Sequence, residues 1–415
     1  MKKERSFLKA GHLPTLVSAF LYFDVSFMIW VLLGALGNYV AADFGLTPIQ
    51  KGLVTAVPLL GGSILRLVFG QLTDILGARK TGCLGLLVTL VPLFGGWLWA
   101  DSIAKVYVVG LLLGVAGASF AVALPMASRW YPAKYQGLAM GVAGAGNSGT
   151  LLATLFAPRL AEAYGWHAVF GLAIIPLLIV AVVFFLFAKE APQVAKVKGS
   201  SEFLSLLKER DTYLFSLFYG VTFGGFVGLA SFLSILLRDQ YRISRVMAGD
   251  LTSLCILAGS VLRPVGGFLA DKFGGMRMLL FLYSSLVMLV LSAAQLPALG
   301  LAVPLLFLIM ACLGLGNGSV FQLVPQRFGN RVGMATGILG TAGGLGGFFL
   351  PTVVGWAKQS SGSYGLGLAS LAGSAGLALA FLMLAQPEWT GDWMAKGGRV
   401  ESTDPILTPE EAEAV

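Results

Sequence analysis

The sequence has little charge and almost no cysteine or histidine. Of its 415 residues, 12% are Asp, Glu, Lys or Arg, about half the share found in an average soluble domain. The 3 cysteines (83, 255 and 312) lie far apart inside apolar segments, and the 2 histidines (12 and 167) show no ligand-like spacing. These patterns argue against a disulfide framework or a zinc site. Phosphate-binding loops and nucleophile elbows are also missing. We therefore expect no enzyme activity, no cofactor and no metal.

Long apolar runs dominate the chain instead. Hydrophobic residues make up 57% of it and the mean hydropathy is +0.83. A helix that crosses a bilayer needs about 20 predominantly apolar residues, and twelve segments of the sequence meet this need. The fold class expected is an all-α polytopic membrane protein with twelve transmembrane helices. The segments are 15–40, 48–74, 82–100, 104–128, 135–163, 167–188, 212–238, 245–273, 277–296, 299–325, 331–358 and 364–386.

The basic residues are distributed unevenly between the two sides of these segments. The N-terminus, alternate loops and the C-terminal tail hold 19 of the 28 Lys and Arg. By the positive-inside rule we expect both termini in the cytoplasm and the protein in the cell inner (cytoplasmic) membrane. The first apolar run is too long for a cleaved signal peptide. This bias accounts for the net charge of +8, so we expect no nucleic acid partner.

The longest polar break divides the chain into two groups of six segments. We expect the tail after Pro387 to be disordered, because it is polar and ends in acidic residues. The predicted parts are a cytoplasmic N-terminus (1–14), a first six-helix bundle (15–188), a cytoplasmic linker (189–211), a second six-helix bundle (212–386) and a cytoplasmic tail (387–415).

An internal repeat relates the two groups. The stretch GGSILRLVFGQLTDILGARK (61–80) places Arg66 inside an apolar helix, which costs about 2.5–3.5 kcal/mol. A shift of 197 residues aligns it with GSVLRPVGGFLADKFGGMR (259–277) and puts Arg66 on Arg263. GASFAVALP (117–125) likewise matches NGSVFQLVP (317–325). Parallel repeats of this kind are typical of transporters that rock two bundles around a midplane site.

The repeated arginine suggests an anion site. Pseudo-twofold symmetry places Arg66 and Arg263 opposite each other in the central cavity, where two cations repel each other. An anion between them would relieve that repulsion. The alternative is that each arginine is tied to a carboxylate or to backbone carbonyls. Carboxylates are nearly absent from the spans, which favours the anion.

Glycine patterns mark the fifth and eleventh segments. QGLAMGVAGAGNSG (136–149) matches VGMATGILGTAGGL (332–345) through three glycines. Glycines on membrane helices permit close approach of the backbones. We therefore expect Gly137, Gly141, Gly144, Gly146 and Gly149 to let neighbouring helices approach and slide. Ordinary helix packing is compatible with the same pattern.

Three motifs resemble known families. G-x-L-x-D-x-x-G-x-R-K (70–80) and its copy at 267–277 resemble the loop signature of the major facilitator superfamily. GVAGAGNSGTLLATLFAPRLA (141–161) resembles the fifth-helix signature of the nitrate/nitrite porter family, and GLGNGSVFQLVPQRF (314–328) resembles its tenth helix. The resemblance implies the major facilitator fold, two pseudo-symmetric six-helix bundles, and nitrate or nitrite as the transported anion. The substrate-binding residues it implies are Arg66, Arg263, Phe120, Asn147, Tyr219 and Phe223.

The chemistry of these residue types suits a planar anion. By the resemblance, the two arginines hold nitrate, the aromatic side chains sandwich it, and Asn147 adds a polar contact. An arginine fork matches planar oxyanions. Without the resemblance, the aromatic residues would be interpreted as bundle packing and Asn147 as an interhelical hydrogen bond. Asp74 and Asp271, with basic residues such as Arg79, are expected at the cytoplasmic rim as latches of a gate.

One carboxylate lies near membrane depth. Asp24, in FLYFDVSFMIW, is a candidate for proton coupling, or alternatively a structural hydrogen-bond or charge partner. Bringing nitrate into a negative interior costs about 2.3 kcal/mol per charge per 100 mV, so uptake needs coupling. The short central loop and QLVPQRF resemble the symport-type branch of the family. We therefore expect a monomer that takes up nitrate with protons. The alternatives are a nitrate/nitrite antiporter or a facilitator for formate or oxalate.

Overall fold

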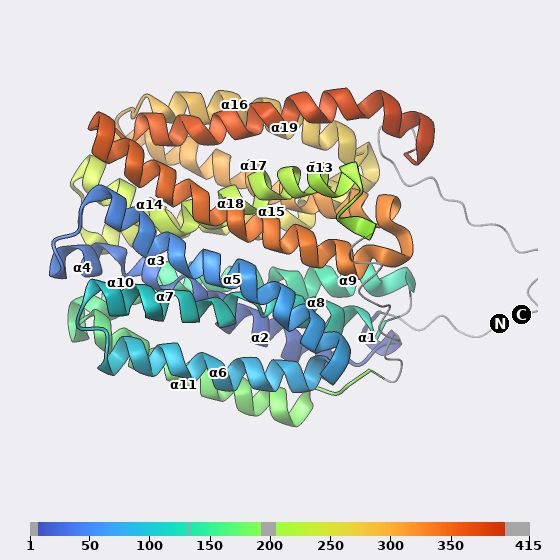
Figure 1. Cartoon of the computed structure of the whole chain (residues 1–415), viewed down its shortest axis with the longest axis horizontal. Helices are drawn as coiled ribbons and strands as arrows, with labels where there is room; N and C mark the ends of the chain where they lie inside the picture. Colours follow the sequence, from blue (N-terminus) through green and yellow to red (C-terminus); the bar gives the residue numbers. More distant parts are fainter. Residues whose placement is uncertain (1–6, 132, 192–204, 395–415) are drawn as a thin grey trace, which may run out of the picture.

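The computed structural model describes residues 7–131, 133–191 and 205–394, which are almost entirely helical and run side by side along the long axis (Figure 1). The first half comprises α1 (Phe7–Ala10), α2 (Leu13–Trp30), α3 (Leu32–Ala35), α4 (Gly37–Asp43), α5 (Pro48–Leu76), α6 (Ala78–Leu98), α7 (Ile103–Gly117), α8 (Phe120–Ser128), α9 (Ala133–Gly144), the 3₁₀ segment η1 (Ala145–Ser148), α10 (Gly149–Tyr164) and α11 (Trp166–Phe187). The second half comprises α13 (Arg210–Tyr219), the π-helical segment η2 (Gly220–Gly224), α14 (Gly225–Tyr241), α15 (Arg245–Phe273), α16 (Gly275–Ala294), α17 (Leu299–Phe328), the 3₁₀ segment η3 (Gly329–Arg331), α18 (Val332–Ser361) and α19 (Gly365–Asp392).

The two halves form two neighbouring groups of helices, the first half below and the second half above in Figure 1. In the described ranges, eleven helices are long and apolar enough to cross a membrane. The segment predicted at 135–163 is not among them, because η1 interrupts it between α9 and α10. Each of the twelve predicted segments therefore has a helical counterpart, and the predicted all-α polytopic fold is confirmed.

The internal repeat is visible in how the arginine-bearing helices begin and end. Thr47 caps α5 by accepting the backbone N–H of Gln50, and Ser244 caps α15 by accepting that of Met247. Both helices end at a glycine with positive φ, +91° at Gly77 and +96° at Gly274. A residue with a side chain rarely adopts that backbone conformation. The repeat read from the sequence is thus a repeat of local structure.

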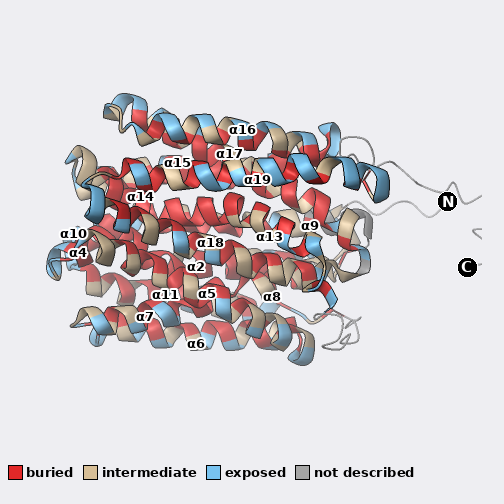
Figure 2. Ribbon diagram, turned by 45° about the horizontal axis from the view of Figure 1, so that its top comes forward, coloured by how far each residue is buried: buried red, intermediate tan, exposed pale blue. Residues whose placement is uncertain are grey.

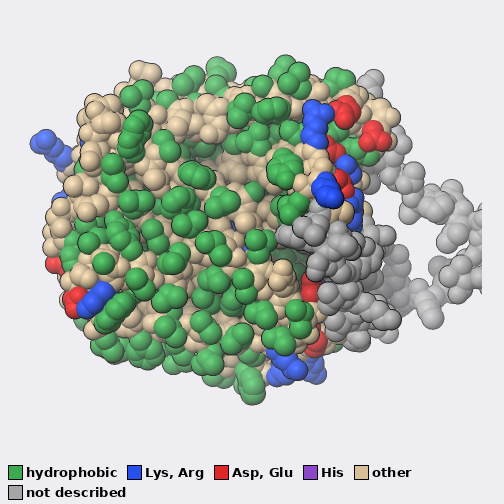
Figure 3. Space-filling view, viewed as in Figure 1, with side chains coloured by type: hydrophobic (Ala, Val, Ile, Leu, Met, Phe, Trp, Pro, Cys, Tyr) green, Lys and Arg blue, Asp and Glu red, His purple; other side chains and the backbone are tan. Residues whose placement is uncertain are grey.

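The outer surface is apolar over most of its length. Charged side chains gather at the two ends, and hydrophobic side chains cover the belt between them (Figure 3). Exposed residues lie on the outward faces of the helices, and buried residues line the region where the halves meet (Figure 2). Outward-facing side chains such as Phe268 and Leu384 are more than 65% exposed. Such a belt is typical of a multi-pass membrane protein surrounded by lipid.

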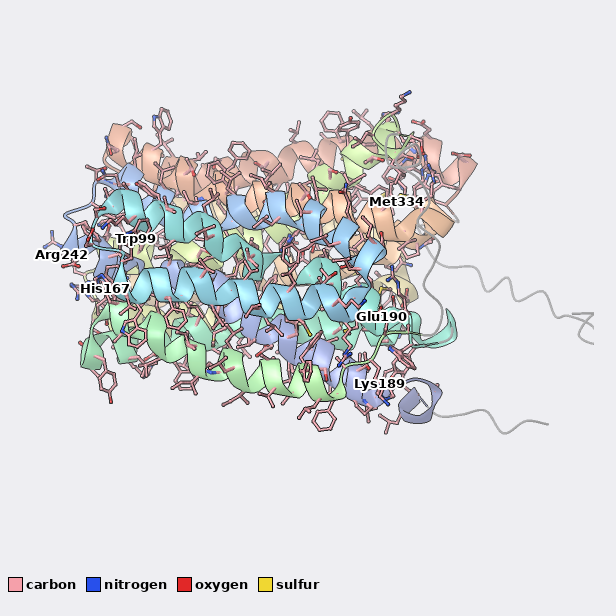
Figure 4. The ribbon with its side chains drawn as sticks, turned by 60° about the horizontal axis from the view of Figure 1, so that its bottom comes forward. Trp99, His167, Lys189, Glu190, Arg242 and Met334 are labelled. Carbon is pink, nitrogen blue, oxygen red and sulfur yellow. The ribbon has the colours of Figure 1, made fainter. Side chains whose placement is uncertain are left out.

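The two ends of the bundle have different neighbours. One end carries α1 and the last turns of α19, and we call it the α1 end; the other carries α4, and we call it the α4 end (Figure 1). Lys189, Glu190 and Met334 lie at the α1 end, whereas Trp99 and Arg242 lie at the α4 end (Figure 4).

The predicted tail begins with helix rather than disorder. Helix α19 continues through Pro387 to Asp392, because Trp389 is 2% exposed and stacks on Phe215 with ring centroids 5.3 Å apart. Its indole N–H also donates to Asp211 at 3.0 Å. Helix α13 likewise begins at Arg210, within the predicted linker. The other parts of the predicted termini and linker, 1–6, 192–204 and 395–415, lie outside the described residues.

Candidate functional site

Arg66 lies at the centre of the bundle, on α5, and is 1% exposed. Its Nε donates to the carbonyl of Gly117 at 3.1 Å, and its Nη1 donates to the carbonyl of Gly340 at 2.6 Å. Gly340 belongs to α18, so this side chain joins the two halves. The remaining nitrogen, Nη2, is buried and has no hydrogen-bond partner in the described part of the chain.

Arg263 holds the corresponding position on α15 and is 9% exposed. Its Nη1 is buried without a hydrogen-bond partner among the described residues. The two guanidinium groups are close enough for each charge to act on the other. Neither makes an ion pair with any carboxylate that the structure describes. A buried charge without a counter-charge is costly, so this centre favours an anion.

Aromatic rings surround Arg66. The ring centroids of Trp30, Phe120 and Phe223 lie 4.9, 5.2 and 5.1 Å from its Cζ. Tyr219 stacks on Phe223 with centroids 5.0 Å apart and an interplanar angle of 8°. The three aromatic positions singled out in the sequence are therefore brought together around one arginine, where cation–π contacts partly offset the lost hydration.

Two aromatic residues at this centre were missed by the sequence analysis. Trp30 is one. The other is Phe321, whose ring lies 5.9 Å from Cζ of Arg263, 5.0 Å from the ring of Tyr219 and 6.4 Å from that of Phe120. Phe321 lies within the repeated segment 317–325, which was the available signal. Trp30 had no comparable signal, because it lies outside the matched repeats.

The local backbone places Tyr219 and Phe223 against the eleventh helix. A π-helical turn, η2, follows Tyr219, and π-helical turns often occur at functional sites. A Cβ added at Gly343 of α18 would lie 2.8 Å from the Tyr219 ring, and one at Gly346 would lie 2.4 Å from the Gly220 carbonyl. Only glycine allows these two elements to approach so closely.

The glycines of the fifth segment were predicted to let neighbouring helices approach closely, and the structure shows this for those at and after η1. A Cβ at Gly146 would lie 2.8 Å from Phe23, and one at Gly149 would lie 1.8 Å from the Asp24 carbonyl. The prediction is wrong for Gly141 and Gly144 in this structure, because a Cβ there would meet nothing within 4 Å. Both lie on α9, on the α1-end side of η1 (Figure 1). Among the glycines of this segment that the structure describes, close contacts therefore occur only beyond the interruption, and the packing around Gly137 lies outside the described residues.

Asn147 lies in η1, which packs against α2 and α15. It is 0% exposed, and both side-chain polar atoms lack a hydrogen-bond partner in the described ranges. The interhelical hydrogen bond considered for it is thus not formed here. Tyr219 is similar: its hydroxyl lies beside the Arg263 guanidinium, but the contact does not have the geometry of a hydrogen bond. A buried amide and a buried hydroxyl thus remain available to a ligand.

Asp24 does not contact the arginines. It lies on α2, and its carboxylate accepts a hydrogen bond from Ser148 Oγ at 2.7 Å, at the junction of η1 and α10. The structure therefore shows the hydrogen-bond alternative for Asp24. No ion pair with Arg66 or Arg263 occurs within the described residues.

The predicted gate residues lie near the α1 end and bind within their own halves. Asp74 pairs with Arg129 at 2.6 Å. Arg79 donates from Nη2 to the carbonyl of Phe185 at 2.9 Å, and Asp271 accepts a hydrogen bond from Gln322. None of these contacts joins the two halves. A latch across the α1 end is therefore not formed in this structure.

Contacts between the halves occur instead at the α4 end. Lys51 of α5 pairs with Asp239 of α14 at 2.6 Å. Arg159 of α10 makes a bidentate pair with Asp250 of α15, at 2.6 and 2.9 Å. The side-chain amide of Asn38 in α4 donates to the backbone carbonyl of Ser234 in α14 at 3.0 Å. The sequence analysis missed all three, because their partners are about a hundred or more residues apart along the chain.

Comparison with known proteins identifies the family and its relatives. Residues 18–351 match the Major Facilitator Superfamily. The chain is 35% identical over 346 residues to the "Nitrite extrusion protein" of Bacillus subtilis, covering 83% of this chain and 87% of that protein. It is also 35% identical over 348 residues to the "Probable nitrate transporter NarT" of Staphylococcus carnosus, covering 83% and 89%.

A solved structure has the same fold. It is a bacterial homologue of the human lysosomal transporter Spinster, described as inward-facing and occupied. The TM-score is 0.68 at 18% identity, and the match covers 92% of this chain and 98% of that one. The family match and the transporter-named relatives indicate a transporter rather than an enzyme. The chain belongs to the Major Facilitator Superfamily and, within it, to the nitrate/nitrite porter family.

Proposed function

We propose that this protein takes up nitrate by alternating access, coupled to protons. The observation that carries the proposal is the pair of buried arginines that have unused donors and no carboxylate partner. Arg66 Nη2, Arg263 Nη1, the Tyr219 hydroxyl and the Asn147 amide are all buried without hydrogen-bond partners in the described residues. A small oxyanion supplies the acceptors that these groups lack. The names of the two relatives support nitrate or nitrite as that anion.

The shape and hydration of nitrate fit this centre better than those of formate or oxalate. Nitrate is planar and weakly hydrated, so aromatic faces and arginine forks can replace its water. The parallel rings of Tyr219 and Phe223, beside the Phe120 ring, provide flat apolar surfaces next to the guanidinium of Arg66. Because both arginines come from one chain, we propose a monomer.

We propose that the α1 end faces the cytoplasm and that both termini lie there, with the protein in the inner membrane. The basic residues support this orientation. Lys189 and Glu190 lie at that end (Figure 4), the backbone N–H of Arg79 donates to Glu190, and Trp130, next to Arg129, donates to the Lys189 carbonyl. The halves are joined at the α4 end, so the structure corresponds to a state that faces the cytoplasm. In the opposite state, Asp74, Asp271 and Arg79 would contribute to a latch across the α1 end.

For the proton we propose Asp24. Its carboxylate binds Ser148, which directly follows Asn147 in η1. Protonation of Asp24 would change this hydrogen bond and so reposition the interrupted fifth segment beside the anion. One proton per nitrate makes uptake electroneutral, and a second would let the membrane potential drive it.

The test is uptake of labelled nitrate into proteoliposomes under an inward proton gradient, with and without nitrite inside. We expect the gradient alone to drive uptake. Asp24→Asn should abolish gradient-driven uptake but leave nitrate binding intact, and Arg66→Lys should weaken binding because lysine lacks the fork. Asp101→Asn and Arg242→Lys alter exposed charges away from the site and serve as controls.

Two outcomes would change the proposal. If only internal nitrite drives uptake, and Asp24→Asn behaves as wild type, the protein is a nitrate/nitrite antiporter and Asp24 is structural. The name of the Bacillus subtilis relative makes this the second candidate. If Arg66→Lys binds nitrate as tightly as wild type, the planar-anion site is wrong.

A further inference from the structure

A second buried asparagine has no assigned role. Asn317 lies on α17, is 0% exposed, and neither Nδ2 nor Oδ1 has a hydrogen-bond partner within the described residues. Buried amides are nearly always hydrogen-bonded, because an unpaired one loses its hydration without compensation. An apolar residue of the same size would be more stable here if Asn317 only filled space.

The geometry of α17 directs Asn317 toward the anion site. Gly314 and Gly318 form the face that packs against α15, since a Cβ on them would lie 2.1 Å from the Gly259 carbonyl and 2.2 Å from the Arg263 carbonyl. Phe321, seven residues after Gly314, lies at the edge of this face and contacts Arg263 and the Tyr219 ring. Residues four apart share a helical face, so Asn317 lies one turn from Phe321 on the side of the site.

The internal repeat shows what is unusual about this position. Asn317 aligns with Gly117, whose carbonyl accepts the Nε of Arg66. A Cβ on Gly117 would lie 2.4 Å from the Trp30 ring, so only glycine fits there. The second half thus carries an amide where the first half has no side chain.

The two arginines are correspondingly unequal. Arg66 uses Nε and Nη1 on backbone carbonyls, whereas Arg263 Nη1 has no partner among the described residues. The side of the site formed by Arg263 therefore has more unused hydrogen-bonding capacity, and Asn317 adds to it.

We propose that Asn317 is a ligand of the transported anion that favours nitrate over nitrite. Its Nδ2 donates to an oxygen of the anion held at Arg263, and its Oδ1 is then free to accept from Arg263 Nη1. Nitrate has three oxygens in one plane and nitrite has two. A donor that serves the third oxygen is satisfied by nitrate and left unpaired by nitrite. This inference rests on the proposed function.

The test compares Asn317→Leu, which has similar size and no polar atoms, with wild type in proteoliposomes. The measured quantities are the nitrate concentration at half-maximal uptake and the nitrite concentration that halves nitrate uptake. We expect the first to rise about tenfold in Asn317→Leu and the second to change much less, so that selectivity falls. Ser319→Ala is the matched control, because Ser319 Oγ bonds to the Leu315 and Gly266 carbonyls on the α15 side.

Asn317→Gly provides a second variant should the leucine variant not insert, and it introduces the residue found at the equivalent position of the first half. We expect it to show the same loss of selectivity. Unchanged nitrate and nitrite constants in either folded variant would overturn the inference and leave the proposed function intact. If wild type transports neither anion, both proposals fail together.

Discussion

Under the proposed alternating access, the contacts at the α4 end predict how the populations of the two access states respond to mutation. The Lys51–Asp239 pair joins α5 to α14, with the two side chains 20% and 24% exposed. Tyr364 also donates to Asp239 Oδ2 at 2.8 Å. Asp239→Asn removes the negative charge and leaves the Lys51 ammonium half-buried without its counter-charge.

The magnitude follows from burial. Exposed ion pairs contribute about 0–1 kcal/mol, and removing one partner of a fully buried pair costs about 3–5 kcal/mol. This pair lies between these limits, so we expect the observed state to lose about 1–2 kcal/mol relative to a state separated at the α4 end. That corresponds to a change of about 5- to 30-fold in the equilibrium constant.

Thiol labelling measures this shift. In a background with the three native cysteines replaced by serine, Thr55→Cys reports on the α4 end, because Thr55 is 1% exposed on α5. Gly141→Cys reports on the α1 end, where a Cβ meets nothing within 4 Å. Labelling of Thr55→Cys follows the minor population, so Asp239→Asn should accelerate it about 5- to 30-fold. Labelling of Gly141→Cys follows the major population, so it should slow noticeably only if the mutation brings the two states close to equal population.

A double-mutant cycle tests whether the Lys51–Asp239 pair holds the two halves together. Lys51→Met should have little further effect once Asp239→Asn is present, because the two residues act as one pair. Independent, additive effects would show that the pair does not hold the halves together, and so would a Thr55→Cys labelling rate within twofold of the parent. Asp101→Asn breaks an ion pair within the first half and should change neither rate.

Three further outcomes follow from contacts already described. Gly344→Ala would place a Cβ 2.2 Å from the Ser63 hydroxyl of α5 and should lower the free energy of unfolding by about 1–3 kcal/mol, which would appear as a lower melting temperature. Gly373→Ala is the control, because a Cβ there would meet nothing within 4 Å, and it should leave the melting temperature unchanged. Phe120→Leu should raise the half-saturating nitrate concentration about 2- to 30-fold in uptake assays through the lost cation–π contact; no change would place the anion elsewhere. Burial, and then a nearby lysine, lower the pKa of His12 below its ordinary 6.5, and His12 Nδ1 accepts the Thr15 N–H that begins α2. This cap is intact above pH 6.5 and is lost as the pH falls through the lowered value. The protection factor of the Thr15 amide in hydrogen exchange should therefore fall only in acid. A protection factor that stays constant with pH would contradict this.

The fold was predictable because hydrophobic length and an internal repeat are strong signals in a membrane chain. The repeat also identified Arg66 and Arg263 as one position before any geometry was known. The aromatic set around Arg66 followed from the family resemblance, and the structure brings Phe120, Tyr219 and Phe223 together around it.

Other features could not be derived from the sequence, because they depend on which segments meet. Lys51 and Asp239 are 188 positions apart, and neither lies in a motif. The open space beside Gly141 and Gly144 depends on which helices pack against α9, and the glycine pattern does not specify them. For Asp24, the hydrogen bond to Ser148 was one of the alternatives considered, whereas its proton-coupling role stays a prediction.

The missing counter-charge at the arginines has a consequence for the electrical behaviour of the transport cycle. On the proposed function, the empty site carries the two arginine charges and an ionised Asp24, a net charge of plus one, and one nitrate with one proton leaves that net charge unchanged. Whatever part of the membrane field this charge crosses, the empty and loaded carriers move the same charge, at about 2.3 kcal/mol per charge per 100 mV for a full crossing. A potential negative inside would therefore hold the empty carrier facing the cytoplasm. Return of the empty carrier to the outward-facing state would then be the step that the potential slows, visible as a transient current in the absence of nitrate.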